Sequence, residues 1–280
     1  MGYKTINVCL NDIAVNEKLL EAVASLASTF DAHINGVYII PAPQFYPTNG
    51  VDIMPIVIDT NQVYFRENSK KVRETFGARM QRDNLAHSFI EIESDLPTMA
   101  NEMIGASEVA DLVVCVTIDE KAAVGIESDF IELLLTSLGR PILILPRHYD
   151  KKLSFDEIIV GWNGSREAAR ATFDAMPILK LASHVHVTIV DPQKIEGLRG
   201  KVPGVDIAET LARHKVKAIA DNYSTNGEEP GVALIEHASE VGAGLIVVGA
   251  YGHSRLREYI LGGVTRTMLS ELDRPVFMSH

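Results

Sequence analysis

The segment TINVCLN at residues 5–11 is similar to EIIVGWN at residues 157–163, and GRPI at 139–142 is similar to DRPV at 273–276. The first pair opens, and the second pair closes, two segments that carry the same order of apolar and polar runs. Self-similarity on this scale indicates a domain repeated in tandem. We therefore expect a first domain at residues 1–147 and a second at residues 155–280, with a polar joint between them.

Short β-branched runs alternate with longer amphipathic stretches in both segments, which is typical of parallel sheets with crossover helices. Strands are expected at 6–10, 34–40, 87–93, 112–117 and 142–145, and again at 158–162, 185–190, 217–220, 245–248 and 276–278. Helices are expected at 17–30, 61–84, 99–109 and 129–138, and again at 166–181, 208–214, 232–241 and 265–272. The pattern predicts an α/β fold of two tandem, doubly wound, five-stranded parallel sheets, Rossmann-like, with strand order 3-2-1-4-5.

Charge and composition exclude several classes of partner. Twenty-six basic against thirty-seven acidic residues give a net charge of -11, which repels phosphate backbones and anionic lipid. We expect no nucleic-acid and no membrane partner. The two cysteines, Cys9 and Cys115, lie in short apolar runs and are expected to be core residues, and the chain begins with a strand-like run rather than a targeting segment. These features favour a reducing, cytoplasmic location.

The second segment carries an unusual set of glycines near the ends of its strands. Gly249 ends the fourth strand, Gly252 follows it, and Gly262 and Gly263 open the last helix. In an open parallel sheet the ligand binds beyond the carboxyl ends of the strands, and glycines there let the backbone approach it closely. Free amides at a helix start favour an anion, so the spacing predicts a phosphate site, although each glycine alone is also typical of a turn.

With this spacing the sequence resembles the universal stress protein family, whose ATP-binding members carry G-x2-G-x9-G-(S/T) in the same loop. The resemblance rests on VVGAYG at 247–252, LGGVT at 261–265, RPV at 274–276 and VGWNGS at 160–165, and it spans nearly the whole chain as two family domains. It implies a stress-response protein that binds an adenine nucleotide (ATP, ADP or AMP), with or without Mg²⁺, in its second domain. The adenosine would lie near the ends of the first two strands and the phosphates in the glycine loop.

On this resemblance the nucleotide-binding residues are expected to be Trp162, Asn163, Val190, Asp191, Val248, Gly249, Tyr251, Gly252, Gly262, Gly263, Val264 and Thr265. Two of them depart from the family pattern. Gly263 replaces the hydroxyl residue that would donate to a phosphate, and Asn163 replaces the usual aspartate. One lost hydrogen bond to a charged group costs about 1.5–3 kcal/mol, so the site is expected to be weakened rather than abolished. His253 and Arg255, inside the glycine loop, are candidate phosphate neighbours.

The first domain lacks the glycine pattern. On alignment Val116 stands for Gly249, Asp119 for Gly252, and Ser128 and Asp129 for Gly262 and Gly263. Branched and acidic side chains disfavour a phosphate, so this copy is expected to be a structural partner. Pro41, Phe45 and Tyr46 could line a pocket for another ligand, but such residues in a loop more often pack locally.

Catalytic and metal sites are not expected. His184 and His186 alternate on one strand and could face one metal, yet two histidines without a third nearby ligand are more often a solvated face. No evident general base or nucleophile set accompanies the glycine loop, so hydrolysis would be slow and incidental at most.

Two functions therefore stay open. The first is a nucleotide-binding, regulatory stress-response protein, and the alternative is an interaction or scaffold module of the same fold that binds no nucleotide. The family resemblance also implies that the two domains pair through their last strands, and that two tandem chains associate as a homodimer with protein partners still to be identified.

Overall fold

The computed structural model describes residues 2–43, 60–96, 98–118, 125–194, 204–225, 227–251 and 263–280. The strands of its first half are β1 (Thr5–Cys9), β2 (His33–Ile40), β3 (His87–Glu93), β4 (Leu112–Val116) and β5 (Ile142–Leu145). Those of its second half are β6 (Glu157–Gly161), β7 (His184–Val190), β8 (Ala218–Tyr223), β9 (Leu245–Gly249) and β10 (Val276–Ser279). The expected strands are all present, with ends shifted by three residues or fewer.

Helices connect these strands in both halves. In the first half they are η1 (Ile13–Val15), α1 (Asn16–Phe30), α2 (Thr60–Arg82), α3 (Ala100–Ser107) and α4 (Phe130–Ser137). In the second half they are α5 (Arg166–Asp174), α6 (Met176–Leu179), η2 (Pro192–Lys194), α7 (Val205–Arg213), α8 (Pro230–Glu240) and α9 (Gly263–Ser270). The prediction of a single helix at 166–181 is wrong in one respect, because the chain forms two helices there, α5 and α6, divided at Ala175. Pro177 has no N–H to donate and cannot continue the ladder of α5.

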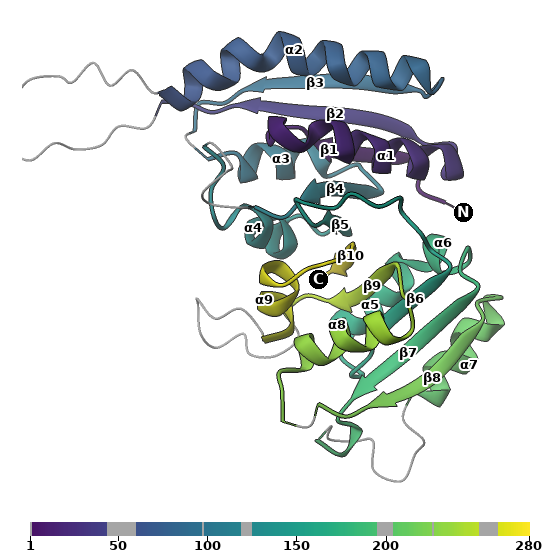
Figure 1. The fold of residues 1–280 in the computed structure, drawn as a ribbon. Coiled ribbons are helices and arrows are strands. Elements are labelled where there is room, and N and C mark those ends of the chain that lie inside the picture. Colours follow the sequence, from purple (N-terminus) through teal and green to yellow (C-terminus); the bar gives the residue numbers. More distant parts are fainter. Residues whose placement is uncertain are drawn as a thin grey trace, which may run out of the picture.

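The strands form one continuous sheet in the order β3-β2-β1-β4-β5-β10-β9-β6-β7-β8 (Figure 1). Within each half all pairs are parallel and the order is 3-2-1-4-5, as the sequence predicts. The repeat extends to the register. Ile6 lies opposite Ile34 and Leu112, and its counterpart Ile158 lies opposite Val185 and Leu245. The two halves therefore share one fold, and equivalent positions can be compared residue by residue.

The last strands join the two halves. β5 and β10 pair antiparallel, with Leu143 opposite Phe277, so the edges of the two five-stranded units become the centre of the sheet. Tyr3 from the first half packs near Phe277, and its hydroxyl donates to the carbonyl of Asp174 at 2.7 Å. Pairing through the last strands is confirmed, and it removes two strand edges that would otherwise be open to other chains.

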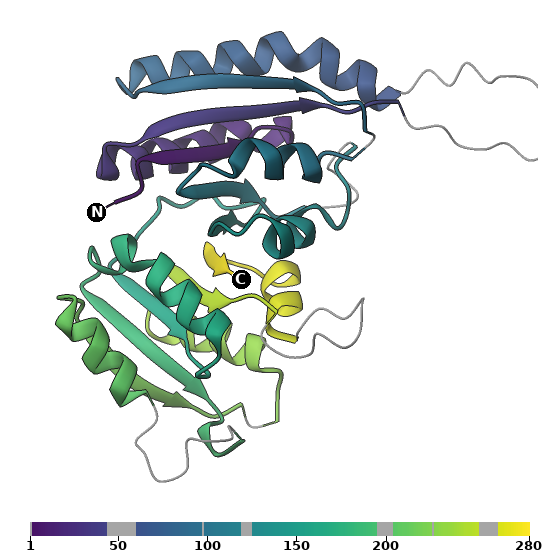
Figure 2. The ribbon, with the colours of Figure 1, turned by 180° about the vertical axis from the view of Figure 1, so that it is seen from behind.

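Helices cover both faces of the sheet. In the second half α8 contacts α9, β6 and β7, whereas α5 contacts β9 and β10, and α7 contacts β8. Figure 1 has α8 in front of the strands, and the reverse view in Figure 2 brings α5 and α7 to the front. Because both faces are covered, the strands can be apolar throughout, and Ile158, Ile159 and Val160 of β6 are all fully buried.

Both cysteines are free and buried in the core of the first half. Burial raises the pKa of the Cys9 thiol to about 12 and that of the Cys115 thiol well above its usual value. Since the thiolate is the reactive form, we expect no reaction of the native chain with a disulfide reagent such as Ellman's at pH 8. In concentrated guanidinium the same chain should release two thiol equivalents. Rapid reaction of the native chain would mean that the core around β1 and β4 opens readily.

Candidate functional site

A cavity of about 360 Å³ lies at the carboxyl ends of β6, β7 and β9. It is lined by ten of the residues singled out from the sequence, namely Trp162, Asn163, Val190, Asp191, Val248, Gly249, Tyr251, Gly263, Val264 and Thr265. Parallel strands end at one edge of the sheet, so segments that are far apart along the chain converge there. Gly252 and Gly262, together with His253 and Arg255, lie outside the described residues.

The start of α9 forms one wall of this cavity. Gly263, Val264 and Thr265 occupy its first turn, where backbone N–H groups have no acceptor within the helix. Thr265 is buried, and its hydroxyl oxygen accepts the amide of Tyr251 at 3.3 Å. Tyr251 itself has a left-handed backbone conformation, with φ of 61°. The hydrogen bond joins the residues after β9 to the first turn of α9, and the start of a helix in a cavity wall suits an anion.

Gly249 has a packing reason to lack a side chain. A Cβ at this position would lie 2.4 Å from the carbonyl carbon of Glu167 and 2.5 Å from the amide nitrogen of Ala168, in the first turn of α5. The backbone of α5 therefore occupies the space beside Gly249. Close approach to a ligand, which the sequence suggested, is not needed to explain this glycine.

The loop after β6 is held by a short chain of hydrogen bonds. The side-chain carbonyl oxygen of Asn163 accepts the amide of Ser165 at 3.0 Å, and Gly164 between them adopts φ of 75°. The Ser165 hydroxyl accepts the amide of Ala168 at 3.1 Å and is the N-cap of α5. Since Asn163 uses its oxygen for the turn, its amide NH₂ is the group left to face a ligand.

Asp191 has a structural task. Its carboxylate accepts the amide of Thr225 at 3.1 Å and the Thr225 hydroxyl at 2.7 Å, and the residue is only 5% exposed. It thereby fastens the end of β7 to the loop after β8. Asp191 still lines the cavity, but most of its hydrogen-bonding capacity is committed to that loop.

Seven further lining residues were not expected from the sequence, namely Gly161, Ser165, Ala168, Thr188, Glu228, Pro230 and Leu234. Ser165 had a visible signal, because serine before a helical run is a preferred N-cap. Pro230 and Leu234 had none, because they reach the cavity from α8, and a sequence pattern does not say which turn of a helix crosses a strand end.

The electrostatics of the described lining are acidic. Asp191 and Glu228 carry its carboxylates, and no lysine, arginine or histidine of the described residues lines the cavity. A Cβ on Gly263 would lie 2.5 Å from a carboxylate oxygen of Glu229, the residue just before α8. Burial raises the pKa of Tyr251, and the Glu132 carboxylate raises it further, so its phenol stays protonated. Attraction of an anion would therefore depend on backbone amides rather than on basic side chains.

In the equivalent region of the first half, the described polar side chains are buried and bonded to other protein groups. Asn11, the counterpart of Asn163, is 2% exposed and exchanges hydrogen bonds with the backbone of Ile39. Beside it, Arg147 donates to Asp12 through two nitrogens, at 2.6 and 3.2 Å, and both side chains are nearly buried. Val116 takes the place of Gly249. Asp129 is exposed at the start of α4, whereas Asp119, Phe45 and Tyr46 lie outside the described residues.

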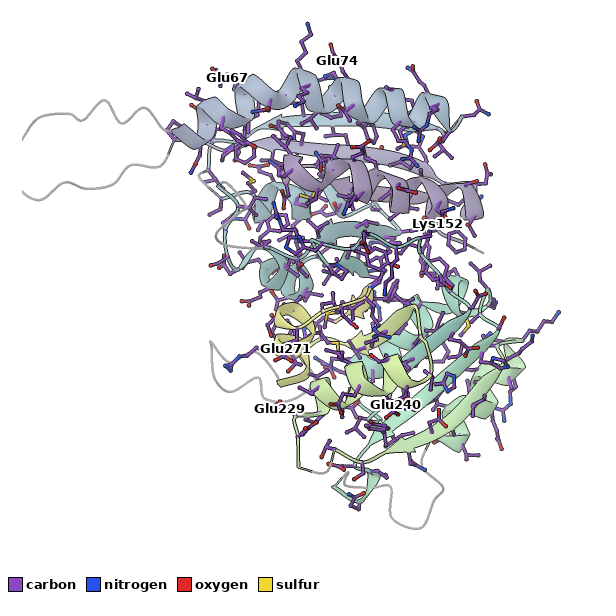
Figure 3. All side chains as sticks on the ribbon, in the orientation of Figure 1. Glu67, Glu74, Lys152, Glu229, Glu240 and Glu271 are labelled. Carbon is purple, nitrogen blue, oxygen red and sulfur yellow. The ribbon has the colours of Figure 1, made fainter. Side chains whose placement is uncertain are left out.

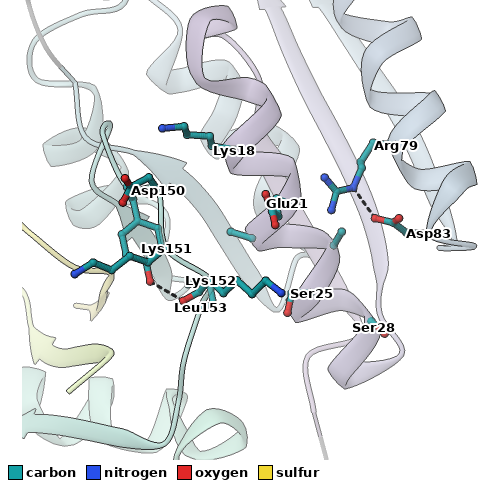
Figure 4. Close-up of a pocket in the computed structure, with 13 residues that line it drawn as sticks. Lys18, Glu21, Ser25, Ser28, Arg79, Asp83, Asp150, Lys151, Lys152 and Leu153 are labelled. Atoms are coloured by element: carbon teal, nitrogen blue, oxygen red, sulfur yellow. Dashed lines mark hydrogen bonds and ion pairs between the residues drawn. The ribbon is translucent and has the colours of Figure 1, made fainter. Parts of the chain in front are cut away.

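A second hollow, of about 500 Å³, lies between α1 and residues 149–153 (Figure 4). Charged side chains of both signs surround it, including Lys18, Glu21 and Lys152. The hydrogen bonds drawn in Figure 4 join lining residues to one another. Arg79 donates to Asp83, and the Tyr149 hydroxyl donates to the Lys152 carbonyl. None of the site residues expected from the sequence lines this hollow, so the cavity at the strand ends is the candidate site.

Among the described residues, no helix combines the length and the apolar character that crossing a bilayer requires.

Comparisons with known proteins agree with this architecture. Residues 154–280 match the model of the universal stress protein family. The stress response protein NhaX of Bacillus subtilis is 23% identical over 160 residues, which cover 44% of this chain and 96% of that protein. A universal stress protein from Archaeoglobus fulgidus superposes with a TM-score of 0.71 at 17% identity, covering 98% of this chain and 95% of its own.

A universal stress protein solved in complex with cAMP covers 45% of this chain and 97% of its own, at 24% identity and a TM-score of 0.36. The family model matches the second half, and the superposition with the Archaeoglobus fulgidus protein extends the same fold to the first. Residues 154–280 therefore match the universal stress protein family by sequence, and the whole chain shares the fold of the Archaeoglobus fulgidus protein.

Proposed function

We propose that the second half binds one adenine nucleotide in the cavity at the ends of β6, β7 and β9, and that this binding is regulatory. The observation that carries the proposal is the convergence of ten expected residues around one cavity, with the first turn of α9 in its wall. The apolar side chains of Trp162, Val190 and Val248 suit a purine ring. The first turn of α9 suits the phosphates.

A regulatory role follows from the chemistry of the lining. Its described residues include no histidine, lysine or cysteine that could act as base or nucleophile. The Ser165 hydroxyl caps α5. Of the two carboxylates in the described lining, that of Asp191 already accepts two hydrogen bonds from Thr225, so we infer that a bound nucleotide is held rather than turned over. We infer that nucleotide occupancy sets the conformation of the loops around the cavity and so the choice of protein partner.

The first half is proposed to stay empty. Asn11 is bonded to the backbone of β2, and the neighbouring Asp12 forms a buried ion pair with Arg147, so neither side chain is available to a ligand. The expected homodimer of tandem chains, the domain boundaries at 147 and 155, and the cytoplasmic location stay predictions.

Calorimetry with ATP, ADP and AMP on the full chain should give one site per chain. Gly263→Ser should tighten binding about tenfold, since a hydroxyl at the first position of α9 adds a hydrogen bond to a phosphate worth about 1.4 kcal/mol. The new side chain displaces only the flexible end of Glu229.

The matched control is Asp129→Ser, which places the same hydroxyl at the equivalent position of the first half and should leave both affinity and stoichiometry unchanged. Glu229→Gln separates the gain of the hydroxyl from the loss of a nearby carboxylate. Two sites per chain, or no nucleotide bound by any variant, would contradict the proposal. The second outcome would favour an interaction module, for which the acidic lining is the supporting observation.

A further inference from the structure

Three side chains from separate elements of the second half meet beneath α8. They are His186 of β7, Asp221 of β8 and His237 of α8, and their ligand atoms all lie within 4.8 Å of one another. Nδ1 of His186 lies 2.7 Å, and Nε2 of His237 lies 3.5 Å, from the same carboxylate oxygen of Asp221. We call these three residues the His-Asp-His cluster.

One buried atom of this cluster lacks a hydrogen bond. Nε2 of His237 lies 3.5 Å from the Asp221 carboxylate, but it forms no hydrogen bond with any of the described residues. Most buried polar groups in folded proteins are hydrogen-bonded, and leaving one unsatisfied costs about 1–3 kcal/mol. The side chain of His237 is 12% exposed, so water reaches it poorly. An atom held in this way is explained if it binds something that the protein itself does not supply.

The outer nitrogens of both rings face carboxylates. Nε2 of His186 lies 3.0 Å from Glu157, and Nδ1 of His237 lies 3.3 Å from Glu240. Glu240 is the last residue of α8 and is labelled in Figure 3. Histidines that bind metals characteristically donate their other ring N–H to a carboxylate, which fixes the tautomer and strengthens the ligand nitrogen. The Tyr223 ring lies 4.7 Å from that of His237 and holds its orientation. Both histidines thus carry the outer support typical of metal ligands.

We propose that the His-Asp-His cluster binds one divalent transition-metal ion of the zinc type. Two imidazole nitrogens and one carboxylate oxygen are a donor set for zinc, whereas magnesium and calcium prefer oxygen alone. Ligand atoms about 2.05 Å from a tetrahedral zinc lie about 3.4 Å apart, which falls within the separations found here. Three protein ligands leave the fourth position to water.

The site would tie α8 to β7 and β8 in the half that also carries the nucleotide cavity. Thr188, two residues after His186 on β7, and Leu234, one turn before His237 on α8, both line that cavity. The proposal does not depend on nucleotide binding, because none of the cluster residues lines the cavity.

The sequence pattern paired His186 with His184 rather than with Asp221 and His237. His184 is 52% exposed and contacts Glu157, but it does not belong to the cluster. The two residues that complete the donor set follow 35 and 51 positions later and approach only when β8 and α8 pack against β7. No spacing of residues along the sequence predicts such a site.

The test is a titration of the metal-free, untagged full chain with Zn²⁺, repeated with Co²⁺ to record the visible spectrum. One ion per chain should bind, with a tetrahedral cobalt spectrum and a rise in melting temperature. Glu157→Gln should weaken binding about 10- to 100-fold through the outer contact, and His237→Ala and Asp221→Asn by more. His184→Ala, which removes a histidine from the same strand, should change the affinity less than threefold.

Melting of each variant without metal checks its fold, and Asp221→Asn preserves shape if His237→Ala does not fold. The absence of stoichiometric Zn²⁺ binding would overturn the proposal. So would an affinity that His237→Ala and Asp221→Asn leave at the wild-type value, or one that His184→Ala lowers as much as they do. Each readout is made without nucleotide, so it stays distinct from the test of the cavity.

Discussion

Replacing Arg147 by methionine is expected to lower the free energy of unfolding by about 3–5 kcal/mol. The guanidinium group of Arg147 makes two hydrogen bonds to Asp12, and the two side chains are only 10% and 7% exposed. Methionine fills much of the same volume but leaves the Asp12 carboxylate buried without its cation. Desolvation of that charge, rather than the loss of packing, accounts for most of the expected effect. Urea unfolding monitored by circular dichroism measures it.

The double variant Asp12→Leu with Arg147→Met should be measured beside the single variant. It removes both charges, and a buried ion pair replaced by apolar groups is often neutral in stability. The exposed pair Lys70 and Glu74, at 3.9 Å, provides the control, and Lys70→Met should cost less than about 0.5 kcal/mol. An effect of Arg147→Met as small as that of Lys70→Met would mean that the buried pair with Asp12 does not stabilise the first half.

Gly249→Ala is expected to destabilise the second half by about 3 kcal/mol, because the added Cβ would lie 2.4 Å from backbone of α5. A flexible side chain could move aside, but here the start of α5 must shift as a unit. That shift also displaces Ser165 and Ala168, which line the cavity. We therefore expect weaker nucleotide binding together with the lower stability, measured by calorimetry and by urea unfolding.

Gly105→Ala is the matched control for this substitution. A Cβ at Gly105, in the middle of α3, meets no atom within 4 Å, and alanine there should stabilise the helix by about 0.5–1 kcal/mol. The first half carries Val116 where the second has Gly249, and its helix α1 begins only after the additional turn η1. If the Gly249→Ala chain had wild-type stability, α5 would be able to shift at no cost in free energy, and the glycine would be needed only for the approach of a ligand.

Much of the candidate site was predictable because it lies where parallel strands end. Trp162, Val190 and Val248 occupy strand ends whose positions follow from the alternation of apolar runs, and the topology brings such ends together. The roles of the individual residues were less predictable. Asp191 and Asn163 looked like ligand contacts, yet each uses oxygen atoms to hold a turn. A sequence gives the type of a polar group but not the partner that it finds.

The repeat, the α/β class and the strand order follow from the amino-acid sequence alone, because the periods of apolar residues and the paired segments at 5–11 and 157–163 are local properties of the chain. The packing of the fold, by contrast, decided that Arg147, which reads as part of a polar joint, pairs with Asp12. It also decided that His186 meets Asp221 and His237. The physical reason is the same in both cases: these contacts join residues far apart in the chain, and their distances are set by packing of strands and helices rather than by spacing along the sequence.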